Sequence, residues 1–134
     1  MKMKNATAGF LGLTTAILHA NLYDTEEKLK ERYGEPVEVE VRKHETKQTY
    51  NWREYTITVE IANFWVYKGE TIFQSTRRLD GKPMTLTEIA SLLKRDYFSG
   101  DWQSSGGDKW HIGNHAVAEY DRMNRTLIEK LRRR

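Results

Sequence analysis

The hydrophobic positions of this chain follow an extended spacing in several places, which predicts a sheet. In VEVEVR, the side chains of Val37, Val39 and Val41 alternate with charged ones, a period of two that is typical of a strand with one buried face. YTITVEI (55–61) repeats this period, and TIFQSTRRL (71–79) is expected to be the strand that returns from it. YKGE, which contains Gly69, is a tight-turn candidate just before this returning strand, so an antiparallel sheet is expected.

A helix is predicted between Asp24, a candidate N-cap, and Gly34, which a proline follows closely. The segment between them, TEEKLKERY, has acids in its first turn, where the helix dipole favours them. We expect a helix of about ten residues. Its expected buried side chains are Leu22, Leu29 and Tyr33.

A second helix is predicted in TLTEIASLLKRDY, where Thr85 and Glu88 have the spacing of a capping box. Helical periodicity places four apolar side chains on one face of it: Leu86, Ile89, Ala90 and Leu93. The last segment, residues 116–131, fits both a helical stripe and a strand pattern, so a helix and a hairpin stay open there.

Together, these elements predict an α+β fold, in which an antiparallel sheet of about four to six strands packs against two short helices. A chain of 134 residues is long enough for one domain, which we assign to residues 21–134.

The first twenty residues have the order of a secretory signal peptide. Lys2 and Lys4 precede an uncharged run from Ala6 to Leu18, and the small residue Ala20 follows. The alternative is a retained N-terminal helix. The run is too short to span a bilayer, so no transmembrane span is expected. From the order of these segments we expect cleavage after residue 20 and export to the periplasm or the cell surface.

Composition disfavours several functions. The net charge is +3, and cleavage would take two lysines from the 22 basic residues, which leaves 20 against 19 acidic ones. Nucleic-acid binding needs a clustered basic face, whereas the body of this chain mixes basic and acidic residues. No nucleic-acid partner is therefore expected. Without cysteine, the chain has no disulfide, no thiol nucleophile and no cysteine-based zinc site.

Several blocks carry a resemblance to known proteins. A capped helix ending in ERYGEP, followed by amphipathic strands and a YKGE turn, is similar to outer-membrane assembly lipoproteins of the SmpA/OmlA type and to β-lactamase-inhibitor-protein-like domains. YDTEEKLKERYGEP, RLDGKPMTLTEIASLLKRD and AVAEYDRMNRTLI more closely resemble small exported proteins of unassigned function from Verrucomicrobia and related bacteria. This resemblance implies an α+β fold and a final hairpin that turns near Arg122 to Arg125, and it implies no activity.

DWQSSGGDKWHIGNH, residues 101–115, holds the candidate chemistry. His111, His115 and Asp108 could form a small hydrolase or metal site, although two histidines are too few ligands for zinc and HIGNH lacks the glutamate of H-E-x-x-H. Ser104 or Ser105 with His111 and Asp101 could form a serine triad, but the segment lacks the G-x-S-x-G elbow.

The sequence therefore favours a structural loop and strand over an active site in this stretch. We expect no catalytic residues, no metal and no cofactor. The sequence predicts a non-catalytic interaction or ligand-binding module of the cell envelope, with a protein or peptide as its partner. We expect Trp110 to be buried and, of the four tryptophans, Trp102 to be the exposed one, because its loop is polar and rich in glycine. The candidate contact residues are Trp102, Asp101, His111, His115, Arg77 and Arg78, where the last two could hold phosphate or carboxylate.

Overall fold

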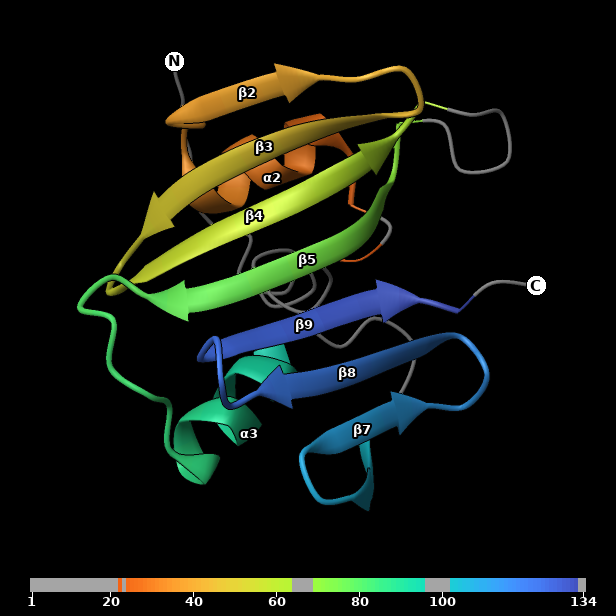
Figure 1. Cartoon of the computed structure of the whole chain (residues 1–134). Helices are drawn as coiled ribbons and strands as arrows, with labels where there is room; N and C mark the ends of the chain where they lie inside the picture. The colour runs from red at the N-terminus through yellow and green to blue at the C-terminus, as the bar shows by residue number, and fades with distance from the viewer. Residues whose placement is uncertain (1–21, 23, 64–68, 96–101, 133–134) are drawn as a thin grey trace, which may run out of the picture.

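The computed structural model describes residues 22, 24–63, 69–95 and 102–132 of the chain (Figure 1). This part contains the helices α2 (Glu26–Tyr33) and α3 (Leu86–Arg95). Its strands are β2 (Glu38–Val41), β3 (Glu45–Trp52), β4 (Tyr55–Ala62), β5 (Thr71–Arg78), β6 (Gln103–Gly106), β7 (Lys109–Ile112), β8 (Ala116–Asp121) and β9 (Thr126–Leu131).

All eight strands form one antiparallel sheet in the order β2-β3-β4-β5-β9-β8-β7-β6. Within the described residues, one helix followed by four strands occurs twice. The last strands of the two units, β5 and β9, pair at the centre of the sheet, so the strand order of one unit mirrors that of the other. We call the units the N-terminal half (α2 and β2 to β5) and the C-terminal half (α3 and β6 to β9).

The predicted α+β class is confirmed, as is an antiparallel sheet packed against two short helices. The predicted number of four to six strands is wrong, because the sheet has eight. The sequence analysis missed β3 and β6. In β3 the buried face includes Gln48, which breaks the hydrophobic period, and β6 is QSSG, which has no apolar residue.

The end signals of α2 are confirmed with one correction at its start. The N-cap is Thr25 rather than Asp24, and the Thr25 hydroxyl accepts a hydrogen bond of 3.3 Å from the Lys28 amide. Asp24 is instead buried and forms an ion pair of 3.0 Å with Arg32. Gly34 ends the helix with a positive φ of 84°, a conformation that glycine adopts without strain. Leu22, Leu29 and Tyr33 are buried as predicted.

The capping box of α3 is also confirmed, because Thr85 and Glu88 exchange hydrogen bonds of 3.1 and 3.3 Å. Its predicted apolar face is partly wrong. Ile89 and Leu93 are buried, but Leu86 is 62% exposed and Ala90 is exposed, and Leu92 is buried in their place.

The core lies between the helices and one face of the sheet, which we call the helix face. It joins side chains of both helices to those of the central strands, including the predicted row Tyr55, Ile57, Val59 and Ile61 of β4. Tyr33 of α2 packs against Tyr50 and Trp52 of β3, with ring centroids 5.5 and 5.6 Å apart. Both helices therefore cover the same face of the sheet (Figure 1).

The expected burial of Val37, Val39 and Val41 is wrong, because all three are between 51% and 77% exposed. The strand itself forms as predicted, but β2 is an edge strand of the sheet. The side chains of α2 contact β3, the next strand inward, so the valines lie beyond the helix.

Residues 116–131 form the hairpin of β8 and β9, with Arg122 to Arg125 in its turn, as the resemblance implied. Neither helix in the described ranges has the length and apolar character that crossing a membrane requires. The predicted signal peptide, residues 1–20, lies outside the described residues.

Candidate functional site

The face of the sheet opposite the helices carries no described helix, and we call it the open face (Figure 1). Because side chains alternate along each strand, the pairing register fixes which of them share this face. One row runs across the whole sheet through paired positions, from β2 to β6: Glu40, Lys47, Glu60, Phe73, Lys130, Val117, His111 and Gln103. The open face thus brings together residues from both halves.

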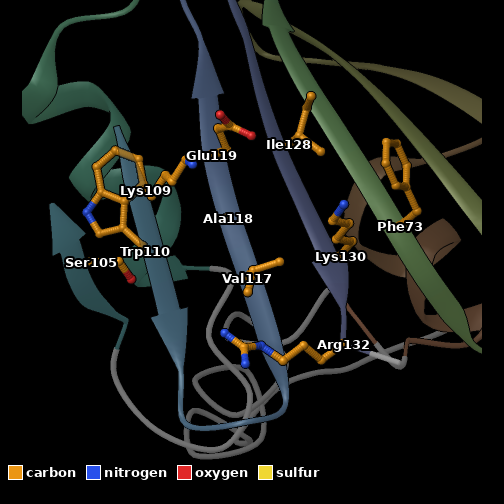
Figure 2. Close-up of a pocket in the computed structure, with 10 residues that line it drawn as sticks. All are labelled: Phe73, Ser105, Lys109, Trp110, Val117, Ala118, Glu119, Ile128, Lys130 and Arg132. Carbon is orange, nitrogen blue, oxygen red and sulfur yellow. The ribbon is translucent and has the colours of Figure 1, made fainter. Parts of the chain in front are cut away.

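The open face is hollowed into a depression of about 500 Å³ over β7, β8 and β9 of the C-terminal half and the adjoining strand β5 of the N-terminal half (Figure 2). Its apolar part is formed by the half-buried side chains of Phe73, Val117 and Ile128, one from each of the three central strands. The depression is therefore an apolar surface that faces solvent in the middle of the sheet.

Three cations surround this apolar surface: Lys109 of β7, Lys130 of β9 and Arg132 just after β9 (Figure 2). Within the described part of the chain, none of their side chains takes part in an ion pair. The lining includes one carboxylate, Glu119, which lies directly opposite Lys109 in the pairing of β7 with β8. Three cations and one carboxylate give the depression an excess of positive charge.

The N-terminal half of the open face has a different surface. Thr49, Thr58 and Ser75 occupy neighbouring positions there, and Lys47 lies between Glu40 and Glu60 in the pairing. Burial, with a smaller effect of the nearby Glu45 carboxylate, raises the pKa of Glu60 above its ordinary value. Apart from Phe73 at the edge of the depression, this half presents hydroxyl groups and alternating charges.

Of the predicted contact residues, His111 lies on the open face, opposite Val117 in the sheet. Its Nδ1 atom is 2.6 Å from the Oγ atom of Ser105, and Ser105 lines the depression. One serine and histidine of the predicted serine triad are thus in hydrogen-bond contact. Asp101, its predicted acid, lies outside the described residues.

The alternative set of His111, His115 and Asp108 does not converge. Asp108 precedes β7 and His115 follows it, and the four residues of that strand separate its ends by about 13 Å. The Asp108 carboxylate is held by the Arg122 guanidinium at 2.6 and 2.8 Å. No three metal-ligating side chains gather anywhere in the described ranges.

The expected exposure of Trp102 is wrong. Its side chain is half-buried against the core, as are the side chains of Trp110 and Trp52, and its indole nitrogen is buried. Trp102 therefore packs on the core and does not extend from its loop as a free aromatic contact. Trp110 was expected to be buried and is half-buried.

Arg77 and Arg78 diverge because they are neighbours on one strand. Arg77 pairs with Thr56 on the open face and is exposed, whereas Arg78 forms ion pairs with Asp80 at 2.8 Å and with Glu88 of α3 at 2.6 Å. Both nevertheless line a second cavity, of about 250 Å³, at the end of β5.

The sequence analysis missed the residues of the depression, above all Phe73, Lys109, Lys130 and Arg132. One signal was available: Lys109 and His111, Val117 and Glu119, and Ile128 and Lys130 each occupy alternate positions of a strand. The alternation alone does not show that these residues share one surface. That depends on the strand order, which brings β5 beside β9.

No protein-family model matches the chain, and neither a curated protein nor a solved structure matches it.

Proposed function

We propose that the chain is an exported, non-catalytic binding module of the bacterial cell envelope that holds an acidic protein or peptide segment on its open face. The observation that carries this proposal is the depression over β5, β9, β8 and β7. Three cations that form no ion pair within the described residues surround an apolar surface there.

Charge and shape complementarity favour a partner that is both acidic and apolar. Carboxylates of the partner would approach Lys109, Lys130 and Arg132, which are exposed and share the lining with one carboxylate, Glu119. Apolar side chains of the partner would cover Phe73, Val117 and Ile128, each of which is only half-buried. A nucleic acid is disfavoured, because the N-terminal half of the same face alternates Glu40, Lys47 and Glu60.

The proposal is tested by fluorescence anisotropy with two labelled peptides, one alternating glutamate with leucine and the other alternating lysine with leucine. The acidic peptide should bind, and its affinity should fall as salt is added, because exposed charge pairs are screened. Lys130→Glu reverses a charge in the middle of the depression and should weaken binding at least about tenfold.

Lys28→Glu is the matched control, because it makes the same charge change on α2, where the exposed Lys28 lies away from the open face. It should leave the affinity unchanged. Equal binding of the two peptides, or equal effects of the two variants, would refute a site for acidic partners on the open face.

Export is tested separately by expressing the chain with its native N-terminus in a Gram-negative host. Intact mass of the product should correspond to a chain that starts at residue 21, as the signal-peptide pattern predicts. A full-length product would contradict the export part of the proposal and leave the peptide-binding part standing.

A serine hydrolase is the second candidate, and the contact of 2.6 Å between Ser105 Oγ and His111 Nδ1 favours it. The test is labelling by a fluorophosphonate, in which a serine oxygen bonds to phosphorus, fluoride leaves and the histidine takes the serine proton. Labelling that is lost in Ser105→Ala would establish an activated serine and would contradict the non-catalytic proposal. We expect no labelling, since both residues lie on β6 and β7, at the exposed edge of the sheet.

A further inference from the structure

A second cavity lies at the opposite end of the central strands from the depression. It has a volume of about 250 Å³ and is lined by four segments: the start of β4, the end of β5, the loop after β5 and the turn between β8 and β9. Four cations line it, namely Arg77, Arg78, Lys82 and Arg125, and its lining, as far as the chain is described, includes no carboxylate.

Two of these cations are fixed by contacts within the protein. Arg78 donates to Asp80 at 2.8 and 3.0 Å and to Glu88 at 2.6 Å. The Arg125 guanidinium donates to the Gly81 carbonyl at 2.8 Å, which joins the β8–β9 turn to the loop after β5. Arg125 also has a positive φ of 53°, a strained conformation for a residue with a side chain. The positions of these two guanidinium groups are therefore set before any ligand arrives.

The other two cations remain available. Arg77 and Lys82 are exposed, and neither takes part in an ion pair within the described residues. The loop that carries Lys82 is anchored, because its backbone amide donates to Asp80 at 2.9 Å. Thr56 adds a half-buried side chain to the wall of the cavity, and its hydroxyl donates to Asn51 Oδ1 at 3.5 Å.

The nearby carboxylates are already engaged. The Arg78 guanidinium and the Lys82 amide hold the pKa of Asp80 well below its usual range. Asp121, in the neighbouring hairpin, accepts from the backbone and side chain of Asn124 at 3.1 and 2.8 Å. Arg77, Lys82 and Arg125 form no ion pair with a carboxylate among the described residues, and the Asp80 charge, which Lys82 also stabilises, is already paired with Arg78.

We propose that this cavity is a binding site for a phosphate group, held by Arg77, Lys82 and Arg125. A carboxylate carries one charge and two oxygens, and one arginine fork satisfies it. A phosphate monoester carries up to two charges and three terminal oxygens, which matches three cations from three separate segments. The site is distinct from the depression, because its lining shares no residue with that of the depression.

The test measures binding of inorganic phosphate to the full chain by ³¹P NMR, at ionic strength held constant with chloride, and obtains the affinity of acetate from its competition with phosphate. Phosphate should bind at least about tenfold more tightly than acetate, because charge-assisted hydrogen bonds add with each donor. Arg77→Gln and Lys82→Gln should each weaken phosphate binding about tenfold.

Lys43→Gln is the matched control, since Lys43 is an exposed lysine in the turn between β2 and β3, with no ion pair among the described residues. It should leave phosphate affinity unchanged. Phosphate binding no tighter than acetate binding, or the same affinity in Arg77→Gln as in the unaltered chain, would overturn the proposal.

A second arm identifies the source of the phosphate group. Vesicles of phosphatidylcholine with and without phosphatidic acid are sedimented with the chain and with Arg77→Gln. Co-sedimentation that needs both phosphatidic acid and Arg77 assigns the site to a lipid headgroup, and its absence alongside phosphate binding assigns it to a small phosphorylated molecule. Failure of the peptide titration would not affect either result.

Discussion

The two halves of the sheet share one plan and differ in what their side chains do. Each half has a capped helix and four antiparallel strands, and the two meet through β5 and β9. On the open face, the N-terminal half alternates acids with Lys47 and presents Thr49 and Thr58, whereas the C-terminal half exposes apolar side chains and cations. Backbone pairing fixes the plan, so the side chains of a solvent-facing surface are free to diverge without changing the fold.

The halves also differ in where they place an arginine–aspartate pair. In the N-terminal half, Arg32 and Asp24 are at 3.0 Å with side chains 4% and 3% exposed, and in the C-terminal half Arg122 is 63% exposed beside Asp108. Arg32→Met should cost about 3 to 5 kcal/mol of unfolding free energy, because it leaves the buried Asp24 charge without its cation. Urea unfolding followed by circular dichroism measures this cost.

Arg122→Met is the control for that prediction. An exposed pair contributes at most about 1 kcal/mol, so its loss should shift the urea midpoint only slightly. Equal costs for the two variants would show that burial does not distinguish the two halves.

The next largest effect is expected where the halves are tied together. Glu88 of α3 accepts hydrogen bonds of 2.6 Å from both Tyr55 and Arg78, which belong to the N-terminal half. Glu88→Gln should cost about 1.5 to 3 kcal/mol at neutral pH, because it removes the negative charge from the group that accepts these two hydrogen bonds. These two hydrogen bonds are expected to hold α3 against β4 and β5.

The pH dependence of this cost has a definite sign. Burial acts to raise the pKa of Glu88, but hydrogen bonds from Tyr55, Arg78 and the Thr85 amide outweigh it and lower the pKa. A lowered carboxyl pKa stabilises the folded state above the unfolded-state pKa of about 4.3, and that stabilisation is lost as pH falls through the folded value. The difference between the unaltered chain and Glu88→Gln should therefore shrink in acid. A difference that is constant from pH 7 to pH 3 would contradict this account.

A smaller effect tests the C-terminal half alone. The buried Tyr120 hydroxyl accepts a hydrogen bond of 2.9 Å from the Met84 amide, just before α3. Tyr120→Phe leaves that amide without its partner and should cost about 1 to 2 kcal/mol, measured by thermal unfolding. Tyr50→Phe, which removes a hydroxyl that donates to the Gln48 side chain, gives the comparison in the N-terminal half.

The smallest effect is expected at the hairpin residues with left-handed backbone. Arg53 has a φ of 54° and Arg125 has a φ of 53°, one in each half. Arg53→Gly should change stability by less than about 1 kcal/mol, because relief of strain is offset by the loss of the Arg53 contact with the Trp52 ring. Arg125→Gly should abolish the phosphate binding proposed above. Arg53→Gly is its control and should leave phosphate binding unchanged, because Arg53 does not line that cavity. Phosphate binding that survives in Arg125→Gly would remove Arg125 from that site.

Local signals predicted the elements whose causes are local. Gly34, the Thr85 and Glu88 capping box and the alternation of β4 each act within a few residues, so the sequence reveals them directly. Burial of the valines in β2 was wrong because it depends on which strand is at the edge of the sheet. Strand β3 was missed because its buried face includes Gln48, whose amide donates to Glu26 of α2 at 2.9 Å.

The candidate sites depend on contacts between distant segments, which explains why the sequence predicted them poorly. Arg77 was a candidate from its charge, but Lys82 and Arg125 join it only because a hairpin turn lies beside the loop after β5. Phe73 and Lys130 share the depression because β5 pairs with β9. The alternation within β7, β8 and β9 is visible in the sequence, but no periodic pattern shows which strands and turns are neighbours.

The mirrored strand order makes each half incomplete as a separate molecule. A fragment that ends after β5 would leave the hydrogen-bonding groups of that strand without β9, and an unpaired strand edge invites another strand. A second copy of the same fragment offers a β5 of matching length and antiparallel direction. The N-terminal half expressed alone is therefore expected to self-associate through β5 into a symmetric dimer. In that dimer, β5 of each fragment would take the place that β9 has beside β5 in the whole chain.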